Sequence, residues 1–347
     1  MLAAPPALDS AEPPAKRART DGVVVPSGIS ALHHIEDWYE QNKEQFTPPV
    51  CNKLMYRGQL SIMLWQSKTT HTHLTDAQAD MVRARLFVGG PNTRKDFHLE
   101  EGSEFFFQLK GNMELPTIQN GERKLVKIKQ GQMFCLPSRI PHSPQRPEAG
   151  SFGLVVERRR EGKEMDGLIF YEDFNTCKKV RWEKFFRCND LGKDLPPVIE
   201  AYKAWEAAGA SAKEFREEDR PVNQEKEIEV PEPFSFEDFL AANAEKLAAG
   251  ESVNLLGLDH PDKEFEVFVI GGRSEQTGKS SDLETWLYQV KGTAHIAVPS
   301  GTLALNEGCC CIVSGVNFTV ARSEGSIGIV LRQNSRGNKP TNGDGQA

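Results

Sequence analysis

The sequence predicts an all-β-dominated fold, in which two similar barrels lie in one chain and are flanked by a few helices. Short runs of β-forming residues, separated by glycine and proline, recur along the stretch from residue 59 to residue 158. Such a series is typical of a sandwich or barrel. Similar runs resume near residue 264. The two stretches also share sequence, which indicates one β unit present twice.

The internal repeat is visible in three pairs of segments. FFQLKG (106–111) matches LYQVKG (287–292), GSFGLVVERR (150–159) matches GSIGIVLRQN (325–334), and FVGG (87–90) matches FVIGG (268–272). Each half also begins with a predicted helix. We therefore interpret the chain as two copies of one barrel.

Individual elements follow from hydrophobic spacing and from residues that end helices and strands. A helix is predicted from Ser30 until Pro48-Pro49, and others at 196–219 and from Ser235 to just before Gly250. The strands predicted in the first half are 59–63, 86–90, 104–110, 124–129, 132–137 and 152–158. The resulting divisions are a disordered tail (1–27), a first barrel (28–195), a helix and charged linker (196–234), a second barrel (235–334) and a disordered tail (335–347).

An atypical insert interrupts the first barrel. The strand QLSIM should continue into FVGG, as EFEVFVIGG does in the second half, but Leu64–Leu86 intervenes. This polar segment is either a surface loop or a fault in the gene model, and we favour the fault. The His71-x-His73 pair within it has no third ligand at a suitable spacing, so we assign it no metal.

Composition excludes several classes of protein. A net charge of −7 gives no reason to expect nucleic acid or anionic membrane as a partner. The seven cysteines form no C-x-x-C pair, and three are consecutive, which fits neither a disulfide framework nor a zinc site. No apolar run reaches membrane-spanning length, and no signal-peptide core is present. We expect a cytoplasmic monomer.

A metal site is predicted from His98, Glu104 and His142. Two imidazoles and one carboxylate form a facial triad that leaves coordination positions open, as a non-haem Fe(II) oxygenase requires for substrate and O₂. A structural zinc site would have four ligands and favour cysteine. The even spacing of His98 and Glu104 predicts side chains on one face of a strand, or of a strand and its turn. These ligand types suit manganese as well as iron.

The spacing around these residues resembles the two motifs of the cupin superfamily. His98-x5-Glu104-x6-Gly111 is followed by Gly131-x5-Pro137-x4-His142. Cupins are small jelly-roll barrels with a central metal. Two positions depart from the general pattern: Glu100 replaces a second histidine, and Arg146 replaces a frequent asparagine. Three ligands remain, which agrees with an open site.

Longer segments resemble the 3-hydroxyanthranilate 3,4-dioxygenase family. They are PPVCNKLM (48–55), GGPNTRKDFHLEEGSEFFFQLKGNMEL (89–115), IKQGQMFCLPSRIPHSPQRP (128–147) and GLVVERRR (153–160). The resemblance implies a two-cupin enzyme that uses Fe(2+) and O₂ to open the ring of 3-hydroxyanthranilate. Its product is 2-amino-3-carboxymuconate semialdehyde, the quinolinate precursor on the route from tryptophan to NAD.

The resemblance also implies roles for individual residues. His98, Glu104 and His142 would be the iron ligands, and Arg94 would lie beside O₂ and substrate. Arg146 suits the substrate carboxylate, because a guanidinium can form a bidentate pair with it. Glu104 and Arg94 would be catalytic residues that also contact substrate.

Glu157 would bind substrate, either accepting a proton or a hydrogen bond from its amino or hydroxyl group. The alternative is an ion pair between Glu157 and the neighbouring Arg158–Arg160. We prefer the substrate role in view of the resemblance. The arginine run itself is interpreted as a solvated or salt-bridged face.

The second half lacks an equivalent metal site. The positions of His98 and Glu104 align with Lys279 and Thr285, and that of His142 falls near Asn317 or Thr319. His260 and His295 lie elsewhere. We therefore expect a metal-free, structural barrel, in which Cys309–Cys311 act as small apolar residues.

Two other functions stay open at this point. A metal-dependent isomerase or epimerase would act without consuming O₂ and usually needs a fuller ligand set. A non-catalytic binding or storage cupin would not need Arg94, Arg146 and Glu157 around the metal.

Overall fold

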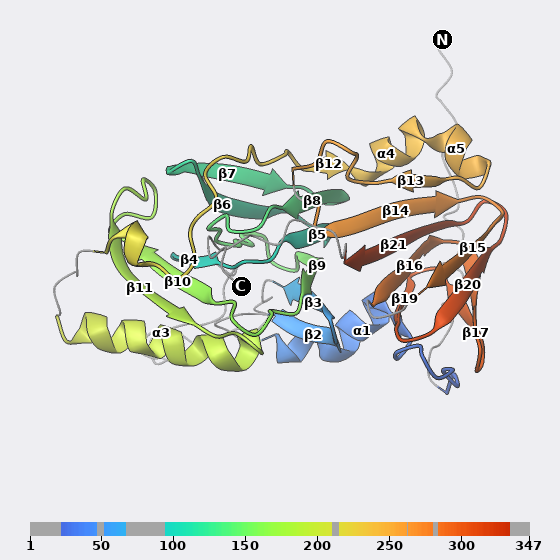
Figure 1. Ribbon diagram of the computed structural model, residues 1–347, viewed down its shortest axis with the longest axis horizontal. Coiled ribbons are helices and arrows are strands. Elements are labelled where there is room, and N and C mark those ends of the chain that lie inside the picture. The colour runs from blue at the N-terminus through green and yellow to red at the C-terminus, as the bar shows by residue number, and fades with distance from the viewer. Residues whose placement is uncertain are drawn as a thin grey trace, which may run out of the picture.

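Each half of the chain folds as a jelly roll of two facing antiparallel sheets, and the two jelly rolls lie side by side (Figure 1). The computed structural model describes residues 22–46, 52–66, 94–209, 215–261, 263–279 and 284–333. The predicted tails at 1–27 and 335–347 lie almost wholly outside these ranges, as does the predicted strand 86–90. The mostly-β fold of two cupin units with few helices is confirmed.

The first jelly roll has a six-stranded sheet with the order β12-β8-β5-β9-β3-β2. Its strands are β2 (Asn52–Arg57), β3 (Leu60–Gln66), β5 (Glu104–Lys110), β8 (Gln132–Leu136), β9 (Phe152–Arg158) and β12 (Phe234–Ser235). The facing layer contains β4 (Asp96–Leu99), β6 (Met113–Gln119), β7 (Glu122–Ile128), β10 (Asp166–Tyr171) and β11 (Val180–Phe186). His142 bridges to both β4 and β6, which joins β11-β10-β4 to β6-β7.

The second jelly roll repeats this arrangement. Its six-stranded sheet has the order β1-β19-β16-β21-β14-β13, and its facing sheet the order β15-β20-β17-β18. The strands are β1 (His33–His34), β13 (Ser252–Asn254), β14 (Phe265–Gly271), β15 (Ser274–Lys279), β16 (Thr285–Lys291), β17 (Thr293–Val298), β18 (Gly301–Asn306), β19 (Cys309–Val313), β20 (Asn317–Arg322) and β21 (Ile327–Gln333).

The two halves exchange their first strands. β1 precedes the first jelly roll in sequence but pairs with β19 of the second, through His33↔Cys310 and His34↔Cys309. β12 precedes the second jelly roll but pairs with β8 of the first, through Phe234↔Met133. Each half therefore completes the six-stranded sheet of the other, which ties the two units together.

A shared hydrophobic core fills the space between the two six-stranded sheets. Ile62 and Val156 of the first jelly roll and Val267 and Leu331 of the second all belong to it and are fully buried. Alternation along β5 directs Phe105 and Phe107 into this core. The side chain between them, Phe106, belongs to the separate interior of the first jelly roll.

The first helix is shorter than predicted. α1 spans Ile35–Asn42, with the short helix η1 (Lys43–Gln45) after it. The residues before it are extended because they form β1, and the His34 side chain caps the helix by accepting from Asp37 N. The expected start at Ser30 is wrong for this reason.

The later helices also differ from their predicted limits. α3 spans Leu191–Ala207, so it begins before Pro196 and Pro197 and contains both. Proline usually indicates a helix start, which explains the error. The helix opening at Ser235 is confirmed, although it divides into α4 (Phe236–Ala242) and α5 (Ala244–Ala248). A further short helix, η2, covers Glu217–Asp219.

The first three residues of the predicted insert belong to a strand. Leu64, Trp65 and Gln66 are the last three residues of β3 and pair with Leu154, Gly153 and Phe152 of β9. The continuous strand therefore ends after Gln66 rather than after Met63. The remainder of the predicted insert lies outside the described residues.

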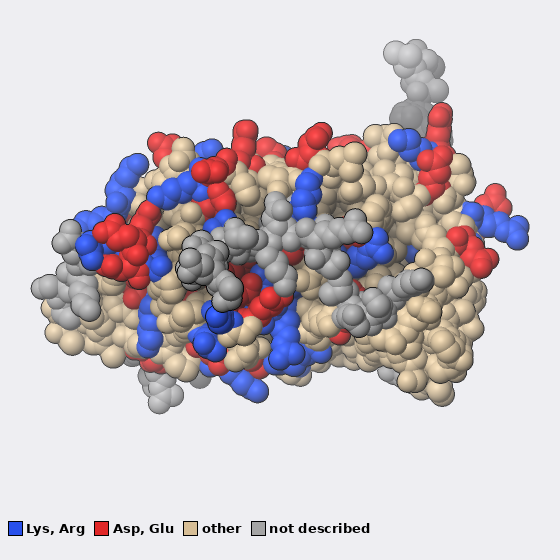
Figure 2. Space-filling view, viewed as in Figure 1, with Lys and Arg blue, Asp and Glu red and all other residues tan. Residues whose placement is uncertain are grey.

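Charged side chains of both signs are interspersed on the face shown in Figure 2, most densely over the first jelly roll. Among the described residues, none of the helices is both long and apolar enough to cross a membrane.

Candidate metal centre

Two histidines and one glutamate meet inside the first jelly roll. His98 lies on β4, Glu104 begins β5, and His142 follows β8. The backbones of His98 and His142 exchange two hydrogen bonds, with N···O distances of 2.7 and 2.9 Å. Ligand atoms of the three side chains lie within 4.8 Å of one another, and each residue is at most 5% exposed.

The reason for this meeting differs from the prediction. β4 belongs to one layer of the jelly roll and β5 to the facing six-stranded sheet. His98 and Glu104 therefore do not share one face of a strand. They converge because the chain turns between the two layers and both side chains point into the interior. The even spacing between them is not the cause.

His142 is oriented by a backbone carbonyl. Its Nδ1 donates to the carbonyl oxygen of Ile140 at 2.9 Å, so that Nε2 faces the Glu104 carboxylate, also at 2.9 Å. Burial opposes the charged imidazolium, but attraction to Glu104 raises the pKa of His142. The same attraction overcomes burial and lowers the pKa of Glu104. An imidazole held through Nδ1 in this way presents Nε2 to a metal.

His98 contacts a buried aspartate that sequence reasoning missed. Asp166 on β10 is 0% exposed, and its Oδ2 lies 2.7 Å from His98 Nε2. Burial lowers the pKa of His98, although Asp166 opposes this effect. The one sequence signal for Asp166 was a single acidic residue directly before the apolar run GLIF.

One guanidinium links three buried carboxylates behind the ligands. Arg160 forms ion pairs with Glu100, Glu157 and Asp166. Burial raises the pKa of Glu157, and the negative charges of Glu104 and Asp166 raise it further. The excess of carboxylates over arginines at this point favours a bound cation.

The arginine run forms salt bridges, which is one of the two forms predicted for it: Arg158 and Arg160 are ion-paired, whereas Arg159 is exposed. Arg158 is 4% exposed and pairs with Glu164 and with Glu264 of the second half. The predicted ion pair between Glu157 and a neighbouring arginine is present, with Arg160 as the partner. Glu157 nevertheless also lines the metal cavity.

Arg94 and Arg146 both reach the same cavity. The Arg94 guanidinium pairs with Asp96, and its backbone N donates to Gln145 Oε1 at 2.7 Å. Arg146 is 1% exposed, and its guanidinium lies 5.5 Å from the ring centre of Trp65. All six predicted site residues line this one cavity, together with Trp65, Phe106, Pro144, Leu191 and Leu195.

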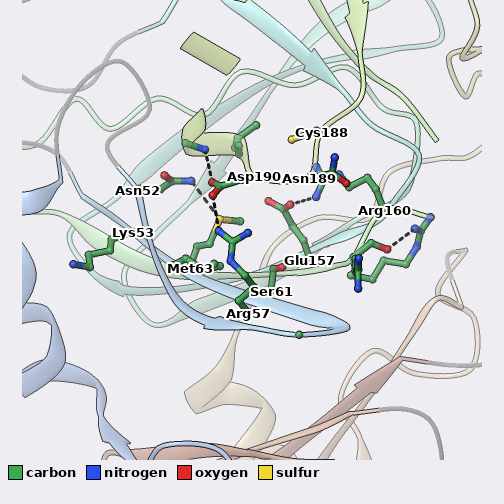
Figure 3. A pocket seen from close by; sticks show the side chains of 16 residues that line it. Asn52, Lys53, Arg57, Ser61, Met63, Glu157, Arg160, Cys188, Asn189 and Asp190 are labelled. Atoms are coloured by element: carbon green, nitrogen blue, oxygen red, sulfur yellow. Dashed lines mark hydrogen bonds and ion pairs between the residues drawn. The ribbon is translucent and has the colours of Figure 1, made fainter. Parts of the chain in front are cut away.

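A larger pocket opens next to the metal cavity (Figure 3). Its volume is about 530 Å³, whereas that of the metal cavity is about 10 Å³. Glu157 and Leu191 line both spaces. In Figure 3, Ser61 and Met63 of β3 lie beside Glu157 on the wall of the larger pocket.

The second jelly roll carries other residue types at the positions that correspond to the predicted ligands. Strand registers agree with the predicted alignment: His98 faces His142 in the first half, and Lys279 faces Asn317 in the second. Thr285 takes the register position of Glu104. Within the described ranges, all of the potential metal-binding clusters lie in the first half.

Sequence comparison decides the family. A family model described as 3-hydroxyanthranilic acid dioxygenase matches residues 28–82 and 77–203. The chain belongs to the 3-hydroxyanthranilate 3,4-dioxygenase family. Relatives with this name include a Xenopus laevis protein that is 38% identical over 309 residues, which cover 86% of this chain and 96% of the relative. A Nematostella vectensis protein is 40% identical over 306 residues, which cover 87% of this chain and 99% of the relative. A Homo sapiens protein is 33% identical over 317 residues, which cover 88% of this chain and 97% of the relative.

Structural comparison agrees on the fold. A salicylate 1,2-dioxygenase from Pseudaminobacter salicylatoxidans superposes with a TM-score of 0.51 at 10% sequence identity, covering 89% of this chain and 84% of that one. Membership of the family confirms that the chain is an enzyme, a ring-cleaving dioxygenase.

Proposed function

We propose that this enzyme opens the ring of 3-hydroxyanthranilate with O₂ to give 2-amino-3-carboxymuconate semialdehyde, using one Fe(2+) held by His98, Glu104 and His142. The observation that carries the proposal is the convergence of these three side chains inside the first jelly roll. The names of the family's members support the substrate. The product would serve as the quinolinate precursor in NAD biosynthesis from tryptophan, in the cytoplasm.

The residues present fit a divalent cation. Three buried ligand side chains meet, the imidazole of His142 is oriented by Ile140, and the surrounding carboxylates outnumber the arginines. A set of two histidines and one carboxylate suits Fe(2+) and leaves positions open. When bound, iron would supply the redox chemistry by which O₂ reacts with the carbon atoms of the aromatic ring.

The protein's own residues would bind and orient the substrate. Arg146 is buried in the cavity wall and suits the substrate carboxylate as a bidentate partner. Glu157 lines the same cavity, where its carboxyl group could accept a proton or a hydrogen bond from the substrate's hydroxyl or amino group. Arg94, held by Asp96, would place positive charge beside the reacting oxygen.

The two alternatives fit less well. An isomerase or epimerase of the cupin class does not explain relatives named as dioxygenases. A storage cupin does not explain why Arg94, Arg146 and Glu157 surround the predicted ligands in one buried cavity.

The test is O₂ uptake by the Fe(2+)-reconstituted full chain with 3-hydroxyanthranilate, beside a His98→Ala control. We expect metal-dependent uptake that matches ring-opened product in stoichiometry and disappears in the control. Absence of uptake, both in the full chain and in the cavity-enlarged variant introduced below, would refute the proposed reaction.

A further inference from the structure

Trp65 occupies the space beside the predicted metal ligands. It lies on β3, is 4% exposed, and lines the same cavity as His98, Glu104 and His142. Its ring faces the Arg146 guanidinium at 5.5 Å. The remaining cavity of about 10 Å³ is roughly the space of a single water. An aromatic carboxylate can therefore lie between Arg146 and the predicted metal ligands only when the indole is displaced.

The end of β3 matches its surroundings poorly. Trp65 Nε1 and Gln66 Oε1 are both buried, and neither has a hydrogen-bond partner in the part of the chain that the structure describes. Buried polar atoms are normally paired, so two adjacent exceptions indicate side chains that this environment does not suit.

The corresponding strand of the second jelly roll, β14, carries different residues at the positions of Trp65 and Gln66. Trp65 pairs with Gly153 as Ile270 pairs with Gly328. Gln66 then takes the register position of Gly271, where a Cβ would lie only 2.7 Å from Leu247 Cβ. The repeat therefore indicates a moderate apolar residue followed by glycine. Residues 88 and 89 of the segment FVGG are Val-Gly.

We propose that Trp65 acts as a plug: its indole fills the place of the substrate ring, and the size of the side chain at position 65 determines whether the site accepts an aromatic carboxylate. The proposal rests on the proposed function for the identity of that ring. The full chain would then hold its metal but bind substrate weakly.

The neighbouring pocket provides the route that the plug closes. Ser61, Met63 and Trp65 alternate along the same inward face of β3. The first two line the 530 Å³ pocket of Figure 3, and Trp65 lines the metal cavity behind Glu157. A smaller side chain at position 65 would enlarge the cavity at the inner end of this face.

Benzoate binding tests the plug without requiring ring cleavage. The affinity of benzoate is measured by anaerobic calorimetry on the Fe(2+)-reconstituted full chain, Trp65→Val and Trp182→Val. Trp182 is a suitable control because it is buried in the same jelly roll against Phe170 and Tyr202, away from the cavity. We expect Trp65→Val to bind benzoate at least tenfold more tightly and Trp182→Val to match the full chain.

Two further variants complete the test. Adding Arg146→Met to Trp65→Val should abolish the gain in affinity. Deleting 64–86 places Val88 at the position of Trp65 and should reproduce the gain even if Trp65→Val folds poorly. Equal benzoate affinity in the full chain, Trp65→Val and the deletion variant would overturn the plug, as would a gain that survives Arg146→Met. A tighter benzoate site without O₂ uptake on 3-hydroxyanthranilate would keep the plug and refute the proposed reaction.

Discussion

Glu264 of the second half accepts a hydrogen bond from the backbone N of Ser103 at 2.6 Å. Ser103 directly precedes the predicted ligand Glu104. The same carboxylate pairs with Arg158, which directly follows Glu157. Glu264 of the second jelly roll thus contacts the residues directly beside two carboxylates of the candidate site.

Replacing Glu264 should therefore affect both stability and metal binding. We expect Glu264→Ala to lower the free energy of unfolding by ~1–3 kcal/mol, because the buried backbone N–H of Ser103 loses its acceptor. Arg158 also loses one ion pair but retains the one with Glu164. Chemical denaturation and a Co(2+) titration measure the two effects. Glu266→Ala is the control, since its ion pair with Arg332 is exposed and should contribute at most ~1 kcal/mol. Equal effects in the two variants would contradict the bracing role.

Asp166 should strengthen metal binding through His98. A carboxylate that hydrogen-bonds a ligating histidine orients the ring and raises its basicity, and its loss typically weakens metal affinity ~10–100-fold. We expect Asp166→Asn to show such a loss in a competition titration against a chromophoric chelator. Asp173→Asn serves as the control, because the Asp173 carboxylate accepts hydrogen bonds from Asn175 and Thr176 at an exposed turn. Unchanged affinity in Asp166→Asn would show that Asp166 does not position His98.

The sequence predicted the repeated β units and the six residues that line the cavity, because strand spacing and motif residues are local signals. β5 and β9 have the predicted limits, 104–110 and 152–158. The exchange of β1 and β12 was not predictable, since each is two residues long and its partner lies in the other half. Asp166 was missed because no motif spacing connects it to His98; only the pairing of β10 with β4 does so.

The end of β3 shows that the internal repeat alone does not predict where a strand ends. Comparison with the second half predicts that the strand continues into FVGG and that the insert starts at Leu64. Leu64–Gln66 nevertheless complete the strand, because any residue with extended backbone can make the ladder to β9. Backbone pairing places little restriction on the side chain. Trp65 is therefore held in the strand although its buried indole N–H finds no partner among the described residues.

The three consecutive cysteines should be unreactive in the folded protein. Burial raises the pKa of Cys309 to about 11 and that of Cys310 to about 12. Alkylation by iodoacetamide at pH 8, read by mass spectrometry, should leave Cys309–Cys311 unmodified until denaturant is added. Modification of the native protein as fast as of the unfolded chain would contradict their burial.

The same shifts set the sign of a pH effect on stability. The pKa of a thiol in the unfolded chain is about 8.5, which is below the folded values. The stability from these protonated thiols is therefore complete below that pH and is lost as the pH rises toward 11. Cys310→Ala should show a smaller loss of stability between pH 8 and pH 10 than the full chain. Parallel losses would contradict the assignment.

Tyr56 should link the first jelly roll to the second. Its buried hydroxyl lies 2.7 Å from the carbonyl oxygen of Cys310 and 2.9 Å from that of Ala31. Tyr56→Phe leaves these groups without their donor and should lower the free energy of unfolding by ~1–2 kcal/mol. Tyr202→Phe, whose hydroxyl contacts Glu206 at an exposed position, should change it little. Denaturation curves for the two variants decide between a linking hydroxyl and an inert one.

The central claim is that one metal ion binds at His98, Glu104 and His142. Its most direct test is the stoichiometry and affinity of anaerobic Fe(2+) binding to the full chain, His142→Ala and His295→Ala. His295 is an exposed histidine on β17 of the second half and serves as the matched control. We predict one ion per chain, lost in His142→Ala and retained in His295→Ala. Undiminished binding in His142→Ala, or loss in His295→Ala, would contradict the account.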